Sequence, residues 1–593
     1  MSKPSIWEII FDKDEIKAAK NKEFTSHELS GAMDQRMKKA LSSRFFRFTK
    51  AASYLISHIS TKVYGTALLS YGLLGSIMFF VGLGDRSIAN PIIGLICALI
   101  SIPLLLSDKP LPIFLQDFRP TDYVLFDFFC MKRHTVRECD RRFPIWLAVV
   151  VGCAVALLSF LLPLWMITLI IGIIILIFIG MESPEFIYLL SLFSLPFLRY
   201  LPSYDFILTA ALVLAAISFT IKVLHGKRVL YIEQYEVCLG AMLLLILVSG
   251  IFVKGIESFS GSVRMIVLAF GYLLASNIIT NRRLAELSAN AIVISGACAS
   301  CVSVIQFVIA MANINGEITN DSLSIILSRG DGVAVFLMAA IVFAIGFAVQ
   351  HNHRRRVLYT ITAFVCVIGL VLSGEVFALT SLLLGLVAYA IMKSNKNSWI
   401  FIPILLIVSV LFLLLPYGVL DVMFNFSPSI VSADELFDLW DGSIKMFARN
   451  MLVGIGIGKE SFAVEMEKLG IFGYNDSSNL FVELGLEAGM FALISFLLML
   501  VTRLRHRALH YTYVKNSQIG GMANLSEVCL FSLLAFGMVN YIWSEPSAYY
   551  LFWCIFGIGS AALRFAKNDY RDRVVYYEES SAYDSSVIDI EIG

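Results

Sequence analysis

Carboxylates capable of acid-base chemistry lie in the stretch GYNDSSNLFVELGLEAG, residues 473–489, which begins polar and ends apolar. Asp476 and Glu483 are its candidate general bases, because a carboxylate in a partly dry cavity can have a raised pKa. Asp476 could instead bind an acceptor or cap the helix that follows, as could Asn479. Glu487 lies within the apolar part and needs a polar partner, as a structural group or as a cavity-facing one.

Cations in the same part of the chain could stabilise negative charge on a departing group. The candidates are Arg329, Lys445, Arg449 and Lys459. Arg329 precedes an apolar run and could be an interface anchor, whereas Arg449 could be a solvated surface side chain. Trp440 is a further binding candidate, either as a ring that stacks on a sugar or as an interface or packing aromatic.

The composition places these residues in a membrane protein. The chain has 593 residues, of which 58% are hydrophobic and 15% charged, and its mean hydropathy is +0.79. This apolar share is well above that of soluble domains. The net charge is +1, and the basic residues are scattered between apolar runs, so the pattern does not suggest a nucleic-acid partner.

About sixteen apolar segments are long enough to cross a bilayer, for which roughly 20 residues are needed. They begin near residues 64, 88, 144, 163, 184, 205, 235, 263, 288, 333, 357, 376, 399, 480, 526 and 548. The long stretches 144–180 and 357–392 are interpreted as tight hairpins. The predicted fold is therefore an all-α, polytopic membrane protein with one large helical extracytoplasmic loop.

The basic clusters indicate the orientation. With the N-terminus inside, every strong cluster falls in a cytoplasmic connection, as the positive-inside rule requires. Both termini are then cytoplasmic. Residues 1–62 form a cytoplasmic segment, 63–183 form about four additional N-terminal spans, and 567–593 form a tail that we expect to be disordered because it is polar and acidic toward its end.

The large outer loop, residues 416–479, is predicted to contain helices. ADELFDLWDGSIKMFARN has apolar residues at helical spacing, and AVEMEKLG indicates a second short helix closed by Gly470. GIGIG, residues 454–458, lies between them. It lacks the Lys-Ser/Thr of a P-loop, so a tight turn is favoured over a phosphate cradle.

Three segments resemble the O-antigen ligase and O-antigen polymerase-like family. These are residues 264–307, LSRGDGVAVFLMAAI at 327–341, and above all LWDGSIKMFARNMLVGIGIGKESF at 439–462, which leads on to SSNLFVELGLEAGMFALISFLLML. Residues 439–462 are similar to a Trp-bearing helix and a Gly-x-Gly turn in the family. The stretch that follows is similar to an Asn-bearing stretch and a Glu-x-Gly helix. The resemblance assigns residues 184–566 to a membrane core of about twelve spans.

The resemblance implies an inverting, metal-free glycosyl transfer from a polyprenyl-pyrophosphate-linked oligosaccharide in the inner (plasma) membrane, with no cofactor. Arginines bind the pyrophosphate in this family, and a loop histidine assists the acceptor hydroxyl. Here Asp476 and two serines stand where that histidine is expected, and Glu375 and Asp434 stand near expected arginine positions.

Three functions remain open after these replacements. In the first, the enzyme ligates or polymerises lipid-linked sugar units with a carboxylate base and other cations. In the second, the fold is a catalytically degenerate glycolipid-binding or assembly partner of polysaccharide machinery. In the third, the protein is a transporter or flippase, although few ionisable residues fall in mid-span.

Overall fold

The computed structural model describes most of the chain outside the N-terminal segment. The described residues are 58–81, 89–131, 133, 144–158, 164–200, 204–224, 228, 230–233, 235–253, 256–313, 327, 331–351, 353–393, 433–470, 472–509 and 520–591. Arg329, the span predicted to begin near residue 399, and loop residues 416–432 lie outside them. Throughout the described ranges the regular structure is helical, and one isolated β-bridge joins Ser60 to Pro110.

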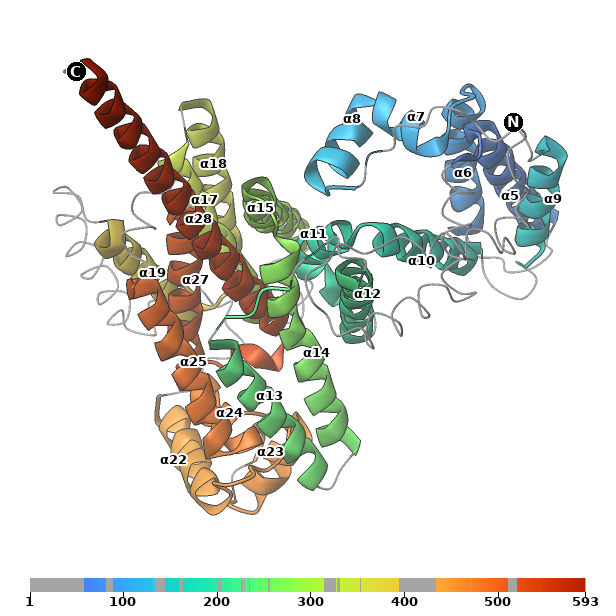
Figure 1. Cartoon of the computed structure of the whole chain (residues 1–593). Helices are drawn as coiled ribbons and strands as arrows, with labels where there is room; N and C mark the ends of the chain where they lie inside the picture. The colour runs from blue at the N-terminus through green and yellow to red at the C-terminus, as the bar shows by residue number, and fades with distance from the viewer. Residues whose placement is uncertain are drawn as a thin grey trace, which may run out of the picture. The chain divides into compact units, whose positions relative to one another are not determined.

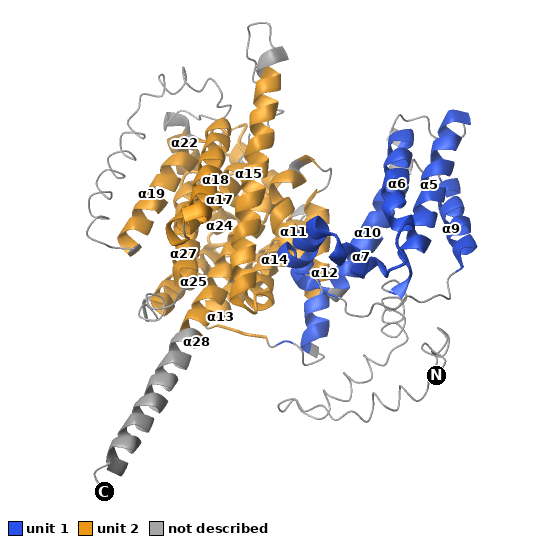
Figure 2. Cartoon of the chain, turned by 90° about the horizontal axis from the view of Figure 1, so that it is seen from above, with its two compact units in different colours: residues 1–186, 217–228 blue, residues 187–216, 229–593 orange. Residues whose placement is uncertain are grey.

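The chain divides into two compact units (Figure 2). Unit 1 comprises residues 1–186 and 217–228, and unit 2 comprises residues 187–216 and 229–593. Two helices contribute residues to both units, α11 (Pro184–Ser194) and α12 (Tyr204–Leu224).

Unit 1 is built on close helix packing at small residues. Its apolar helices are α5 (Thr61–Val81), α6 (Ala89–Leu105), α9 (Ile145–Leu157) and α10 (Leu164–Glu182), and the short helices α7 (Leu111–Asp117), α8 (Arg119–Thr121) and η1 (Asp122–Phe128) follow α6. A Cβ on Gly72 would lie 2.6 Å from the Gly94 carbonyl oxygen. Small residues therefore let α5 and α6 approach closely, as in other membrane helix pairs.

Unit 2 contains the remaining helices and the loop (Figure 1). Its elements in order are η3 (Leu195–Tyr200), α13 (Tyr235–Phe252), α14 (Ile256–Ile278), α15 (Arg282–Asn313), α17 (Asp331–Gln350), α18 (His353–Leu372), α19 (Val376–Lys393), α22 (Ala433–Arg449), α23 (Lys459–Glu467), α24 (Leu480–Ala488), α25 (Met490–Leu509), α27 (Gly520–Gly537), η4 (Ile542–Ser544) and α28 (Pro546–Glu591). The first half of α28 and nearly all of α17 are buried and form the core. The disordered tail that the sequence predicts at residues 567–593 stays a prediction.

Nine helices in the described part of the chain are long and apolar enough to cross a membrane, and five shorter apolar helices accompany them. The prediction of an all-helical, multi-pass membrane protein is therefore confirmed. The long stretches at 144–180 and 357–392 are each broken into two helices, α9 with α10 and α18 with α19. The segment predicted to begin near residue 480 is also two helices, because α24 ends at Ala488 and Gly489 separates it from α25.

The two ends of unit 2 differ in chemistry. At one end, Arg503 donates to Glu527 and to the Phe556 carbonyl, and Arg564 donates to the carbonyl of Ile279 just beyond α14. The start of α14 lies at the other end, where the Ser258 hydroxyl accepts a hydrogen bond from the Ile457 amide of the loop. We call this second end the loop end, and α22, α23 and α24 gather there (Figure 1).

Candidate active site

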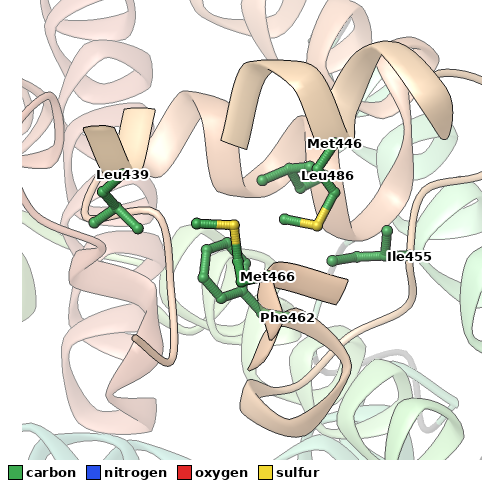
Figure 3. Close-up of a cluster of buried hydrophobic side chains, with 6 residues drawn as sticks. All are labelled: Leu439, Met446, Ile455, Phe462, Met466 and Leu486. Atoms are coloured by element: carbon green, nitrogen blue, oxygen red, sulfur yellow. The ribbon is translucent and has the colours of Figure 1, made fainter. Parts of the chain in front are cut away.

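The loop helices form a small hydrophobic core of their own. Six buried side chains from α22, α23, α24 and the turn between the first two pack together: Leu439, Met446, Ile455, Phe462, Met466 and Leu486 (Figure 3). Those on α22 recur at helical spacing, which confirms the amphipathic helix predicted there. This core fixes α24, and with it the carboxylates, relative to the rest of the loop.

The GIGIG segment is a tight turn bound to the end of α24. Gly454, Gly456 and Gly458 all have positive φ, while Ile455 and Ile457 between them are buried. Only glycine adopts such angles without strain. The Ile455 amide donates to the Leu486 carbonyl at 2.7 Å. The turn therefore satisfies a backbone carbonyl at the end of α24. The Ile455 amide that does so is not available to bind phosphate.

Replacing Gly454 with alanine is expected to destabilise the protein by about 2 to 4 kcal/mol. Its Cβ would lie 2.5 Å from the carbonyl oxygens of both Leu486 and Glu487, at φ +82°. Gly470→Ala is the matched control, because Gly470 has φ +79° but open space around it. Thermal unfolding in detergent should show a clearly larger loss for Gly454→Ala, and equal losses would contradict the proposed close contact.

The start of α24 is a capped helix N-terminus. The Asn479 side chain accepts hydrogen bonds from the Phe481 and Val482 amides, and its own amide donates to the Met538 carbonyl at 2.8 Å. Asn479 is thus the helix cap, the alternative that the sequence left open. Its side-chain oxygen is committed to that cap, although the sequence also proposed it as a substrate-binding group.

The three acidic residues differ in their surroundings. Glu483 is buried and accepts from the Ser477 amide at 2.7 Å, which reinforces the cap. Glu487, one turn later, accepts from the Tyr541 hydroxyl at 2.7 Å and from the Gly458 amide at 3.4 Å. Asp476 is half-buried, and its Oδ1 accepts from the Ser478 amide at 3.0 Å. It is the most accessible carboxylate of the three.

Burial changes the charge of the two glutamates. The nine residues of α24 are roughly 14 Å long, too short to cross a bilayer, and α24 is not among the candidate spans. Burial raises the pKa of Glu487 to about 7, and burial together with the repulsion of Glu487 raises the pKa of Glu483 well above its usual value. At neutral pH the pair therefore retains protons that solvated glutamates would lose.

The raised pKa of Glu487 predicts a stability effect that grows with pH. Between the usual pKa of 4.5 and about 7, the folded protein holds a proton that the unfolded chain releases, so wild-type stability falls as pH rises through this window. Glu487→Gln cannot ionise and should become more stable than wild type by up to about 3 kcal/mol near pH 8. Unfolding from pH 5 to 8 measures this. The exposed Glu467→Gln is the control, and a pH-independent difference for Glu487→Gln would contradict the prediction.

Sequence reasoning missed a group of polar residues at the loop end. Arg264 of α14 pairs with Asp205 at 2.8 Å, and the hydroxyl of Tyr204 donates to Glu545 at 2.6 Å. Arg264 is also close enough to Glu487 to oppose the rise in its pKa. An arginine within an apolar helix is expensive in a membrane, and this rule could have singled out Arg264 from the sequence.

The cations proposed from the sequence are less well placed. Lys445 pairs with Asp441 of its own helix, and both side chains are exposed. Arg449 and Lys459 are exposed, and within the described residues neither has an ion-pair partner. Trp440 is half-buried, stacks edge-on against Phe437, and has a buried indole N–H without an acceptor in the described part of the chain. These four residues stay predictions as substrate-binding groups.

The fold and the polar loop end define a class, a multi-pass membrane protein whose large helical loop holds three carboxylates, one of which, Glu487, is under the electrostatic influence of Arg264. Residues 361–497 match the O-antigen ligase family model. The chain is thus O-antigen ligase-like over a stretch that runs from α18 through the loop into α25, which confirms the resemblance predicted from the sequence, although over a shorter segment. No curated protein matches the chain.

At the level of the family, this match supports membrane glycosyl transfer of the O-antigen ligase or polymerase type and a role in polysaccharide biosynthesis. The family implies a lipid-linked oligosaccharide as substrate. The matched segment contains the predicted loop residues from Trp440 to Glu487. It does not contain Arg264, Tyr204 or Tyr541, which the structure adds.

Proposed function

We propose that the protein ligates or polymerises polyprenyl-pyrophosphate-linked oligosaccharide into a cell-surface polysaccharide, with its loop end on the outer side of the plasma membrane. The observation that carries the proposal is that Glu487 of the loop interacts electrostatically with both Asp476 and Arg264 of α14, at one end of unit 2. A base and a cation on the surface of a membrane core are the two groups that this transfer requires.

In the proposed reaction, an acceptor sugar hydroxyl attacks the anomeric carbon of the lipid-linked unit. A new glycosidic C–O bond forms as the bond to the pyrophosphate breaks, and the configuration inverts. Asp476 takes the hydroxyl proton because it is the most accessible of the three carboxylates. The polyprenyl pyrophosphate leaves with the bonding electron pair, and Arg264 stabilises the charge that develops on it.

The buried glutamates explain how a pyrophosphate could approach an acidic site. Three ionised carboxylates would repel it by several kcal/mol at short range and low dielectric. The raised pKa values of Glu483 and Glu487 reduce that negative charge near neutral pH. Glu487 then acts as a neutral hydrogen-bonding group of the site rather than as a second anion.

The assembly-partner alternative is favoured by a different observation. The Glu483 carboxylate reinforces the cap of α24, and Lys445 is held by Asp441, so two groups with proposed chemical roles have structural ones. A non-catalytic protein that binds glycolipid would need only such a stable loop.

A deletion strain distinguishes the two functions. The size profiles of surface polysaccharide and of lipid-linked oligosaccharide are measured after complementation with wild type, Asp476→Ala or Arg329→Ala. Accumulation of short lipid-linked units that Asp476→Ala fails to relieve, at normal membrane levels, supports the enzyme. Full rescue by both variants supports the assembly partner.

A further inference from the structure

The loop carries an exposed apolar face that its own core does not cover. Phe437 and Ile444 of α22 are 64% and 57% exposed, and Leu452 in the turn after the helix is 67% exposed. Phe437 and Ile444 are seven residues apart, which places them on one side of α22, and Met451 follows in the turn after the helix. We define the rim surface as Phe437, Ile444, Met451, Leu452 and Val453.

The other exposed side of α22 is charged. Asp441 and Lys445 are paired there, and Arg449 follows one turn later. An apolar stripe beside a charged stripe on one exposed helix surface is the pattern of a helix that lies in a membrane interface. A helix surrounded only by water would not favour the apolar stripe.

The rim surface is attached to the start of α25, a helix of 20 residues whose first 13 carry no charge. The Met490 amide, the first residue of α25, donates to the Met451 carbonyl at 2.8 Å. A Cβ on Gly489 would collide with the Leu452 carbonyl oxygen, so the turn packs directly against the junction of α24 and α25. Large apolar side chains remain exposed along α25 itself, among them Phe491 and Leu498. The rim surface is thus continuous with the exposed apolar surface of α25.

The length of α25 indicates how deep the junction of α24 and α25 lies in the membrane. Its apolar part ends before Arg503, so about 13 residues, or roughly 20 Å, are available to cross a hydrocarbon layer of about 30 Å. A span that is too short leaves its apolar end inside the bilayer boundary. The start of α25 and the turn bonded to it therefore lie at that boundary, not above it.

We propose that the rim surface is a membrane-docking site, where the five apolar side chains insert between lipid headgroups and the upper acyl chains at the loop end. The occupant is the lipid bilayer itself. Docking completes the short span of α25 and holds the loop core, with α24, at the level of the membrane surface. This inference rests on α25 crossing the membrane and does not depend on the proposed glycosyl transfer.

The test places a small fluorescent amino acid in the full-length protein by nonsense suppression, at residue 444 or 452, with residue 445 as the control. The control position is on the same helix and exposed, but on the charged stripe. Each protein is reconstituted in phospholipid nanodiscs. Quenching is measured with a nitroxide lipid whose probe lies just below the headgroups, and separately with aqueous iodide. All labelled positions are exposed, so unchanged thermal unfolding verifies the fold.

We expect the nitroxide lipid to quench the labels at 444 and 452 at least about threefold more than the label at 445, with iodide showing the opposite order. Strong iodide quenching at all three positions, with none from the nitroxide lipid, would show that the face points into water. Protection of 444 and 452 from both quenchers would show that another part of the chain or a second copy covers it. Either result overturns the proposal.

Discussion

Asp476→Asn is expected to lower the rate of glycosyl transfer by roughly 10²- to 10⁴-fold, the usual contribution of a general base. The asparagine side-chain oxygen can still accept the hydrogen bond from the Ser478 amide that Asp476 Oδ1 accepts at 3.0 Å, so the local turn should remain. Asparagine cannot take up the proton of the acceptor hydroxyl. The measurement is the turnover of lipid-linked oligosaccharide in membranes that contain equal amounts of each protein.

Asp441→Asn is the control for this prediction. Asp441 is an exposed carboxylate of the same loop whose partner is Lys445. Its loss should change the rate by less than about twofold, because an exposed ion pair contributes little to stability. Transfer by Asp476→Asn at a rate close to wild type would remove Asp476 from the chemistry.

Arg264→Gln is expected to lower the rate by roughly 10²- to 10³-fold, as the loss of one group that stabilises developing charge does in other enzymes. Gln keeps a hydrogen-bonding side chain but no charge, and Arg264→Lys should recover part of the rate. The effect should fall mainly on kcat, because the charge on the leaving pyrophosphate grows in the transition state.

Asp205→Asn separates a chemical role of Arg264 from a structural one. The 2.8 Å ion pair links α14 to the start of α12, and both variants break it. If Arg264 acts on the substrate, Asp205→Asn should retain most of the activity. Equal losses in Arg264→Gln and Asp205→Asn, with equal losses of thermal stability, would show that only the ion pair matters.

Local patterns in the sequence were sufficient to predict the loop helices. The apolar spacing in residues 433–449 predicts α22, and Asn479 is a possible cap for α24 by its residue type. The predicted second loop helix is α23, but its C-cap is Lys468 and not Gly470, so that part of the prediction was wrong. These features depend on residues within a few positions of one another. Hydropathy likewise predicted most of the membrane helices. An apolar segment that crosses a bilayer must satisfy its own backbone hydrogen bonds, so it forms a helix.

The contacts that assemble the candidate site were not predictable in the same way. Tyr541 meets Glu487 across 54 positions of sequence, and Ser258 meets Ile457 across 199. Such pairs depend on how the helices are arranged in space, and they cannot be predicted from the spacing of residues along the sequence. The break at Gly489 was also missed, because its positive φ depends on the tight packing of the Leu452 carbonyl against α24.

Release of polyprenyl pyrophosphate by the purified protein tests the proposed enzyme most directly. Wild type and Asp476→Asn are reconstituted in vesicles with a polyprenyl-pyrophosphate-linked oligosaccharide that serves as both donor and acceptor. We expect wild type to release polyprenyl pyrophosphate and to form longer glycan chains in equal molar amounts, and Asp476→Asn to do neither at a comparable rate. Binding of the glycolipid by wild type without any release or chain growth would contradict the enzyme and leave the assembly partner.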